Sequence, residues 1–144
     1  MKKNIILGLM LILPTLSWAE TVKLKFTNIG KVKGRMAIAV FNDPQAFPDN
    51  VKKTVFTKFI AIATGSEEMV ATIDLKPGSY AIAAYLDQNN NGTLDKNIMG
   101  IPKERFGFSK NPSVQFSAPN FAECEVDVVE GKSVIFPINL LKFL

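Results

Sequence analysis

Apolar and polar side chains alternate with a period of two along most of this chain, and this pattern predicts β-strands rather than helices. In residues 22–27 (Val-Lys-Leu-Lys-Phe-Thr) every second side chain is apolar, as on a strand with one face in water. Residues 35–42 and 79–86 are apolar on both faces, with small alanines between larger side chains, which indicates central strands. The remaining candidate strands are residues 54–62, 68–75, 114–117, 123–129 and 133–140.

The number and length of these strands favour one fold class. About seven to eight short strands, separated by turn signals, are typical of an all-β protein built as a single antiparallel β-sandwich of the immunoglobulin or transthyretin type. Pro77-Gly78 is one such turn signal, because proline and glycine dominate tight connections. No segment shows a convincing helical period, and residues 43–50, which contain two prolines, are expected to form a loop.

The first residues have the pattern of an export signal. Lys2 and Lys3 precede an apolar stretch at residues 5–13, and Ser17-Trp18-Ala19 has the small-x-small form of a cleavage site. We therefore expect residues 1–19 to be a signal peptide and residues 20–144 to be a single β-sandwich domain. A membrane-spanning helix needs about 20 apolar residues, so no transmembrane segment is expected after signal removal. The expected location is the periplasm or the extracellular medium.

Composition narrows the function classes. The chain contains no histidine, which removes the commonest general base and the usual ligand of catalytic zinc, so we expect no enzyme activity. The net charge of +4 includes Lys2 and Lys3, so residues 20–144 carry +2, too little to predict a nucleic-acid partner. Cys124 is the single cysteine, and alternation with Val126 and Val128 predicts a buried thiol on the same strand face.

One segment carries a recognisable chemistry, residues 87–97 (Asp-Gln-Asn-Asn-Asn-Gly-Thr-Leu-Asp-Lys-Asn). Oxygen-bearing side chains occur at every second position and glycine takes the sixth place, as in loops that bind calcium. The predicted metal ligands are the side chains of Asp87, Asn89, Asn91 and Asp95, with the backbone carbonyl of Thr93. Glu104, in the next segment, is a candidate additional ligand.

Two features separate this loop from an EF-hand. The preceding element is a predicted strand, and the twelfth position from Asp87 is Ile98 instead of a glutamate. A calcium site of this kind would have a Kd of about 10⁻⁴ to 10⁻³ M, the range of extracellular modules. Magnesium fits less well because it demands stricter octahedral geometry. A metal-free polar turn is the alternative, since asparagine and glycine also dominate turns.

The segment that follows the loop carries a family resemblance. Residues 100–111 (Gly-Ile-Pro-Lys-Glu-Arg-Phe-Gly-Phe-Ser-Lys-Asn), taken with residues 78–83, the loop and Pro119-Asn120-Phe121, resemble a family of small bacterial exported proteins catalogued as domain of unknown function 2141. The resemblance covers most of the mature chain and is most specific over residues 78–111. It implies an exported β-sandwich. It implies no activity, because none is assigned to the family, and no functional residue is carried over.

Two interpretations of residues 100–111 follow from their chemistry. The segment is either a structural cover on one end of the sheet, with its phenylalanines packed beneath it, or one side of a ligand groove formed with the loop. Aromatic platforms suit sugars and peptides. The candidate groove residues are Arg105, Phe106, Phe108 and Asn111.

The sequence thus favours a non-enzymatic module of the cell envelope or exterior that binds an unknown glycan, peptide or protein. The first alternative is a purely structural or assembly domain with a metal-free loop. The second is a small hydrolase that uses two carboxylates from Asp87, Asp95 and Glu104. The identity of any ligand and the oligomeric state stay open.

Overall fold

The computed structural model describes residues 18–143, so the predicted signal peptide lies almost wholly outside the described residues. Eight strands and two short helical turns make up this part of the chain. The strands are β1 (Glu20–Thr27), β2 (Arg35–Phe41), β3 (Phe56–Ala61), β4 (Met69–Leu75), β5 (Gly78–Asp87), β6 (Phe106–Phe108), β7 (Val126–Val128) and β8 (Val134–Asn139), and the helical turns are the 3₁₀ helix η1 (Val51–Lys53) and α1 (Phe121–Cys124). Within residues 18–143 no helix has the length and apolarity needed to cross a membrane.

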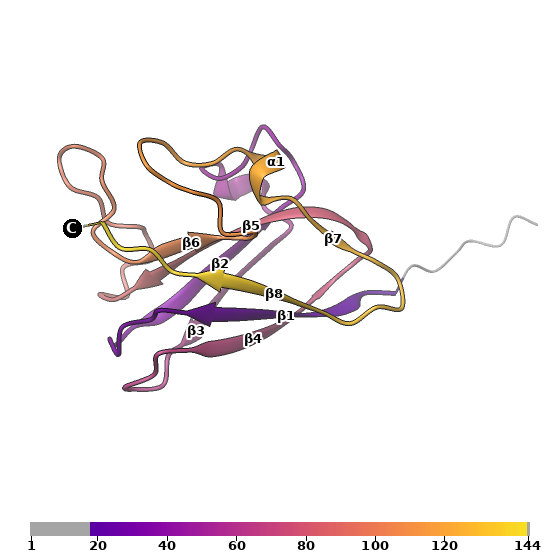
Figure 1. Cartoon of the computed structure of the whole chain (residues 1–144), viewed down its shortest axis with the longest axis horizontal. Coiled ribbons are helices and arrows are strands. Elements are labelled where there is room, and N and C mark those ends of the chain that lie inside the picture. Colours follow the sequence, from indigo (N-terminus) through magenta and orange to yellow (C-terminus); the bar gives the residue numbers. More distant parts are fainter. Residues whose placement is uncertain (1–17, 144) are drawn as a thin grey trace, which may run out of the picture.

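The strands form two sheets, which confirms the predicted β-sandwich. The smaller sheet has the order β4-β1-β8, and the larger has the order β3-β2-β5-β6, with β7 paired to the first part of β5. Figure 1 shows β8, β1 and β4 side by side, with α1 and the long loops on the far side of the larger sheet. The pairing is antiparallel except between β1 and β8, which run parallel, so the smaller sheet is mixed rather than fully antiparallel.

The main core lies between the two sheets. β1 contributes Val22, Leu24 and Phe26, which are fully buried, and this confirms the alternation seen in its sequence. The larger sheet contributes mostly bulky side chains to this core, among them Met36, Ile38 and Val40 of β2 and Ile82 and Leu86 of β5, with the small Ala84 as an exception. Burial of these side chains removes about 1.5–3 kcal/mol of unfavourable hydration each, which is the main source of stability for the sandwich.

A second apolar cluster covers part of the outer face of the larger sheet. Phe47, from the loop after β2, packs edge-on against Phe41, Phe108 and Phe121, with ring centroids 5.3, 5.8 and 6.1 Å apart. Such edge-to-face pairs add about 0.5–1.5 kcal/mol to their burial. This second cluster explains why β2 and β5 are apolar on both faces, as expected for central strands.

Two of the predicted strands differ from the structure. Residues 114–117 are irregular, and the strand of this region is instead β6, which is not among the predicted strands. β6 pairs with β5 and packs against β8, where a Cβ on Gly107 would lie 2.9 Å from Ile138 Cγ2. A residue without a side chain at position 107 therefore lets this short strand approach β8 closely.

The other difference concerns residues 123–129. Asn120 and Glu123 form a capping box, so the chain turns through α1 before β7 begins at Val126. Cys124 consequently belongs to the second apolar cluster, whereas Val126 belongs to the main core, and the prediction of a shared face is wrong. The thiol is fully buried as expected; burial and the nearby Glu123 raise the pKa of Cys124 to about 12, so it is an inert thiol.

Candidate functional site

The predicted metal loop begins at Asp87, the last residue of β5, and this carboxylate is fully buried. Arg35 stands opposite Asp87 in the β2–β5 register, and its Nε donates a hydrogen bond of 2.8 Å to Asp87 Oδ2. The backbone N–H groups of Asn91 and Gly92 each donate to the same carboxylate over 3.0 Å. Burial alone would raise the pKa of Asp87, but the Arg35 hydrogen bond and the two N–H donors together lower it, so Asp87 stays ionised.

Arg35 therefore supplies a positive charge at the base of the loop. Its guanidinium carbon lies 4.1 Å from the centroid of the Phe59 ring, and its Nη2 donates to the carbonyl oxygen of Asn90 over 3.3 Å. A cation held between an aromatic face and a carboxylate is fixed in orientation. The chain just before Arg35 also passes very close to the start of the loop. Glycine is required at position 34, where φ is +136°, because a Cβ there would lie 2.4 Å from the carbonyl oxygen of Asp87.

Three of the predicted ligands meet above this ion pair. The side-chain amides of Asn89 and Asn91 donate to the two carboxylate oxygens of Asp95, over 2.6 and 2.9 Å. Thr93 donates from both its backbone N–H and its hydroxyl to the Asn91 side-chain oxygen. The structure thus brings Asn89, Asn91 and Asp95 together, while Asp87 faces Arg35 instead of joining them.

Glu104 is buried and joins the two ends of the loop. Its Oε1 accepts from the backbone N–H of Gln88 over 2.9 Å, and its Oε2 accepts from that of Asp95 over 3.1 Å. Charge-assisted bonds to backbone N–H groups hold the loop closed from beneath. Within residues 18–143, no group of three or more Asp, Glu or Cys side chains has metal-binding geometry. The oxygen-bearing side chains that do meet, from Asn89, Asn91 and Asp95, are of the chemical type that calcium takes as ligands.

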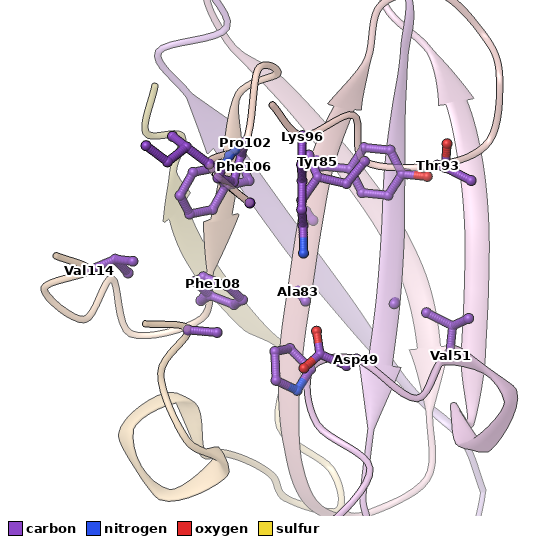
Figure 2. A pocket seen from close by; sticks show the side chains of 18 of the residues that line it. Asp49, Val51, Ala83, Tyr85, Thr93, Lys96, Pro102, Phe106, Phe108 and Val114 are labelled. Atoms are coloured by element: carbon purple, nitrogen blue, oxygen red, sulfur yellow. The ribbon is translucent and has the colours of Figure 1, made fainter. Parts of the chain in front are cut away.

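A groove of about 900 Å³ lies on the outer face of the larger sheet, beside this loop. Its floor is made of small side chains, Ala37, Ala39 and Ala83, with Tyr85 at one end. Figure 2 shows Phe106 and Phe108 along one side and Val51 and Thr93 along the other. The loop itself supplies part of the wall through residues 92–94 and 96, followed by 99–102.

Two of the four candidate groove residues line this groove and two lie elsewhere. Phe106 and Phe108 are in its wall. Arg105 packs against Gly30, where a Cβ would lie 2.7 Å from its Nη2. Asn111 is exposed and bonds to the backbone, donating to the Pro137 carbonyl and accepting from the Asn139 N–H. The segment is therefore both a cover, through its buried phenylalanines, and a groove wall.

Several groove residues were missed by sequence reasoning. Val51, Phe59, Met99 and Phe116 line the groove and are between 44% and 100% exposed, although each is a large apolar side chain. They come from four separate segments of the chain. Phe59 lies on strand β3 and Val51 in η1, whereas Met99 and Phe116 are large apolar residues in polar loops, the one signal in the sequence that could have identified them.

The hydroxyl of Tyr85 faces the loop end of the groove. Burial, together with the carboxylates of Asp87 and Glu104, raises the pKa of Tyr85 to about 12. Figure 2 shows this hydroxyl pointing toward Thr93, and within residues 18–143 no hydrogen bond joins it to the protein. It is therefore a neutral donor available to a ligand or to water.

Fold and site together define a small β-sandwich with an apolar groove and a polar loop stabilised by an internal ion pair. The chain belongs to the family described as "Uncharacterized protein conserved in bacteria (DUF2141)", whose model matches residues 24–135. This confirms the resemblance found in residues 78–111. No curated protein matches the chain, and no solved structure matches it.

Proposed function

We propose that this chain is an exported, non-enzymatic binding module of the cell envelope or exterior, and that the groove on the outer face of the larger sheet is its ligand site. The groove carries this proposal. Its volume of about 900 Å³ lies within the 300–1,000 Å³ typical of small-molecule sites, and it is mostly apolar with a few polar groups.

The floor of the groove supports a binding role further. Side chains on the outer face of a sheet are normally polar or covered by other elements. Here Ala39 and Ala83 are half-buried at the bottom of the groove, so the apolar floor is only partly covered. A purely structural domain has no need of a partly open apolar surface of this kind.

The carboxylates of the loop support a non-enzymatic role over a hydrolase. Asp87 is ion-paired with Arg35, and both oxygens of Glu104 accept backbone N–H groups. A general acid must lose and regain its proton near the working pH, and the Arg35 hydrogen bond, which helps to lower the pKa of Asp87, opposes this at Asp87. The two oxygens of Glu104 are already occupied by the loop backbone. These groups thus serve the loop better than they would serve acid–base catalysis.

The groove is tested with the uncharged fluorescent probe N-phenyl-1-naphthylamine. We expect the folded wild-type domain to bind the probe and the variant Ala39→Phe, which fills the floor, to lose at least tenfold in affinity. Thr72→Phe is the matched control, because Thr72 is exposed on β4 and a ring there adds the same apolar area away from the groove. Equal binding by wild type and Ala39→Phe would contradict the proposal.

We also propose that the loop takes a calcium ion with a Kd of about 10⁻⁴ to 10⁻³ M. The loop spelling motivates this, and Asn89, Asn91 and Asp95 lie together. Both amides now donate through nitrogen to Asp95, so an ion would require each amide to turn its oxygen inward. Arg35 already neutralises Asp87, which is a physical reason for weak affinity. Thermal unfolding is the test: at calcium tenfold above Kd, the Tm should rise by about 5 °C over the value in chelator, and less in Asp95→Asn. A Tm insensitive to millimolar calcium would establish the metal-free loop instead.

A further inference from the structure

Among the described residues that line the groove, two carry charge, Asp49 and Lys96, and they come from opposite rims. Figure 2 shows the two side chains pointing toward one another above Ala83. Neither takes part in the ion pairs that the structure shows within residues 18–143. Both side chains are exposed. The groove therefore presents one positive and one negative group over an apolar floor.

Exposed apolar side chains around the groove are the second observation. Phe116 is 100% exposed and Met99 is 77% exposed, while Val51 and Phe59 are 59% and 44% exposed. Large apolar side chains gathered around one groove lose contact with water when an apolar ligand fills it, at about 25 cal/mol per Å² of buried area. Methionine adapts its shape to such a ligand more readily than branched residues do. The body of the ligand should therefore be a flexible hydrocarbon.

The charges restrict the head group of that ligand. A head group with only a negative charge would be attracted by Lys96 and repelled by Asp49, and the two terms would largely cancel at similar distances. A purely positive head group meets the same cancellation with opposite signs. A head group that carries both charges gains from both side chains.

On the basis of the proposed binding function, we propose that the groove binds a single-chain amphiphile with a zwitterionic head group, of the lysophosphatidylethanolamine class. The hydrocarbon chain lies along the alanine floor under Met99 and Phe116. The phosphate meets the ammonium group of Lys96, and the ammonium group of the ligand meets the carboxylate of Asp49. No covalent step is involved.

The test is displacement of N-phenyl-1-naphthylamine by lipids that share one acyl chain, each below its micelle concentration. Lysophosphatidylethanolamine should compete about fivefold more tightly than its N-acetyl derivative, which is anionic, and than the corresponding alkylamine, which is cationic. Fivefold corresponds to about 1 kcal/mol, the value of one partly exposed charge pair.

Two variants complete the experiment. Lys96→Met and Asp49→Asn should each weaken lysophosphatidylethanolamine about fivefold, whereas Asp49→Asn should strengthen the N-acetyl lipid. Both positions are exposed, so the variants should keep the Tm of the wild type. Equal affinity for all three lipids, or tighter zwitterion binding by Asp49→Asn, would overturn the assignment.

The outcomes also separate this inference from the proposed function. If Ala39→Phe abolishes probe binding and none of the lipids displaces the probe from wild type, the groove is a ligand site and the zwitterionic amphiphile is the wrong ligand class. Displacement by an apolar peptide in place of lipid would have the same meaning. If the probe does not bind in the groove at all, the proposed function fails, and this inference fails with it.

Discussion

The two faces of the larger sheet are both apolar, yet they are built from different side chains. On the inner face, Ile38, Ile82 and Leu86 fill the space against the smaller sheet and are almost completely buried. On the outer face, alanines alternate with these residues, and the surface is covered only at one end by the second cluster and at the other by the loop. The difference teaches that apolar strands need not be wholly covered: side-chain size decides whether a face becomes a core or a groove.

The ion pair at the end of the outer face gives the largest expected effect. Arg35→Ala should lower the free energy of unfolding by about 3 kcal/mol, because Asp87 would keep a buried charge without its partner. This is the lower end of the range for a buried pair, since the Arg35 side chain is 32% exposed. Urea unfolding measures this. Lys25→Ala is the control, because its pair with Glu68 is largely exposed and should contribute less than about 1 kcal/mol. Equal effects of the two variants would show that Arg35 does not hold the loop.

The faces are compared directly by one substitution at two neighbouring residues of β5. Ala84 belongs to the main core and Ala83 to the groove floor. Ala84→Leu should destabilise the fold by about 1–3 kcal/mol through overpacking. Ala83→Leu should change stability by less than about 0.5 kcal/mol, since the groove has room, but should abolish probe binding. The comparison of faces fails if Ala83→Leu is as destabilising as Ala84→Leu.

Acid gives the smallest of these effects. The pKa of Asp87 is lowered in the folded state, so its contribution to stability is complete above the unfolded pKa of about 3.9 and is lost as the pH falls below that value through the folded pKa. Denaturant unfolding between neutral and acidic pH should therefore show a fall below about pH 4 that is shallower in Asp87→Asn. Asp74→Asn, which removes the same charge from an exposed position on β4, is the charge-matched control. An unchanged slope in Asp87→Asn would mean that Arg35 contributes nothing through this charge.

The comparison also shows which features of the fold and site could be predicted from the sequence. Alternation in β1 and the doubly apolar β2 and β5 are local patterns, so the strands and the sandwich were predictable. The partner of Asp87 was not, because Arg35 is 52 residues away and meets it only through strand register. In the same way, Phe59, Met99 and Phe116 become groove residues only once distant segments fold together.

One wrong strand prediction, residues 123–129, could have been avoided from a local signal in the sequence. Asn120 and Glu123 have the spacing of a capping box, which could have predicted α1 and separated Cys124 from β7. The missed strand Phe106-Gly107-Phe108 has no comparable local signal. It is short, and it forms a strand because it can pair with the free edge of β5. The calcium loop remains a prediction, since spacing brings Asn89, Asn91 and Asp95 together whether or not an ion joins them.

The parallel pairing of β1 with β8 has a consequence for how the chain must fold. Val22 pairs with Val134, so the first strand of the domain cannot complete its sheet until the last strand is available. Contacts between such distant segments slow folding, because a long loop of chain must close before they contribute. While its C-terminal segment is not yet available for pairing, the chain therefore stays incompletely folded, and one edge of β1 is open to pairing with other chains.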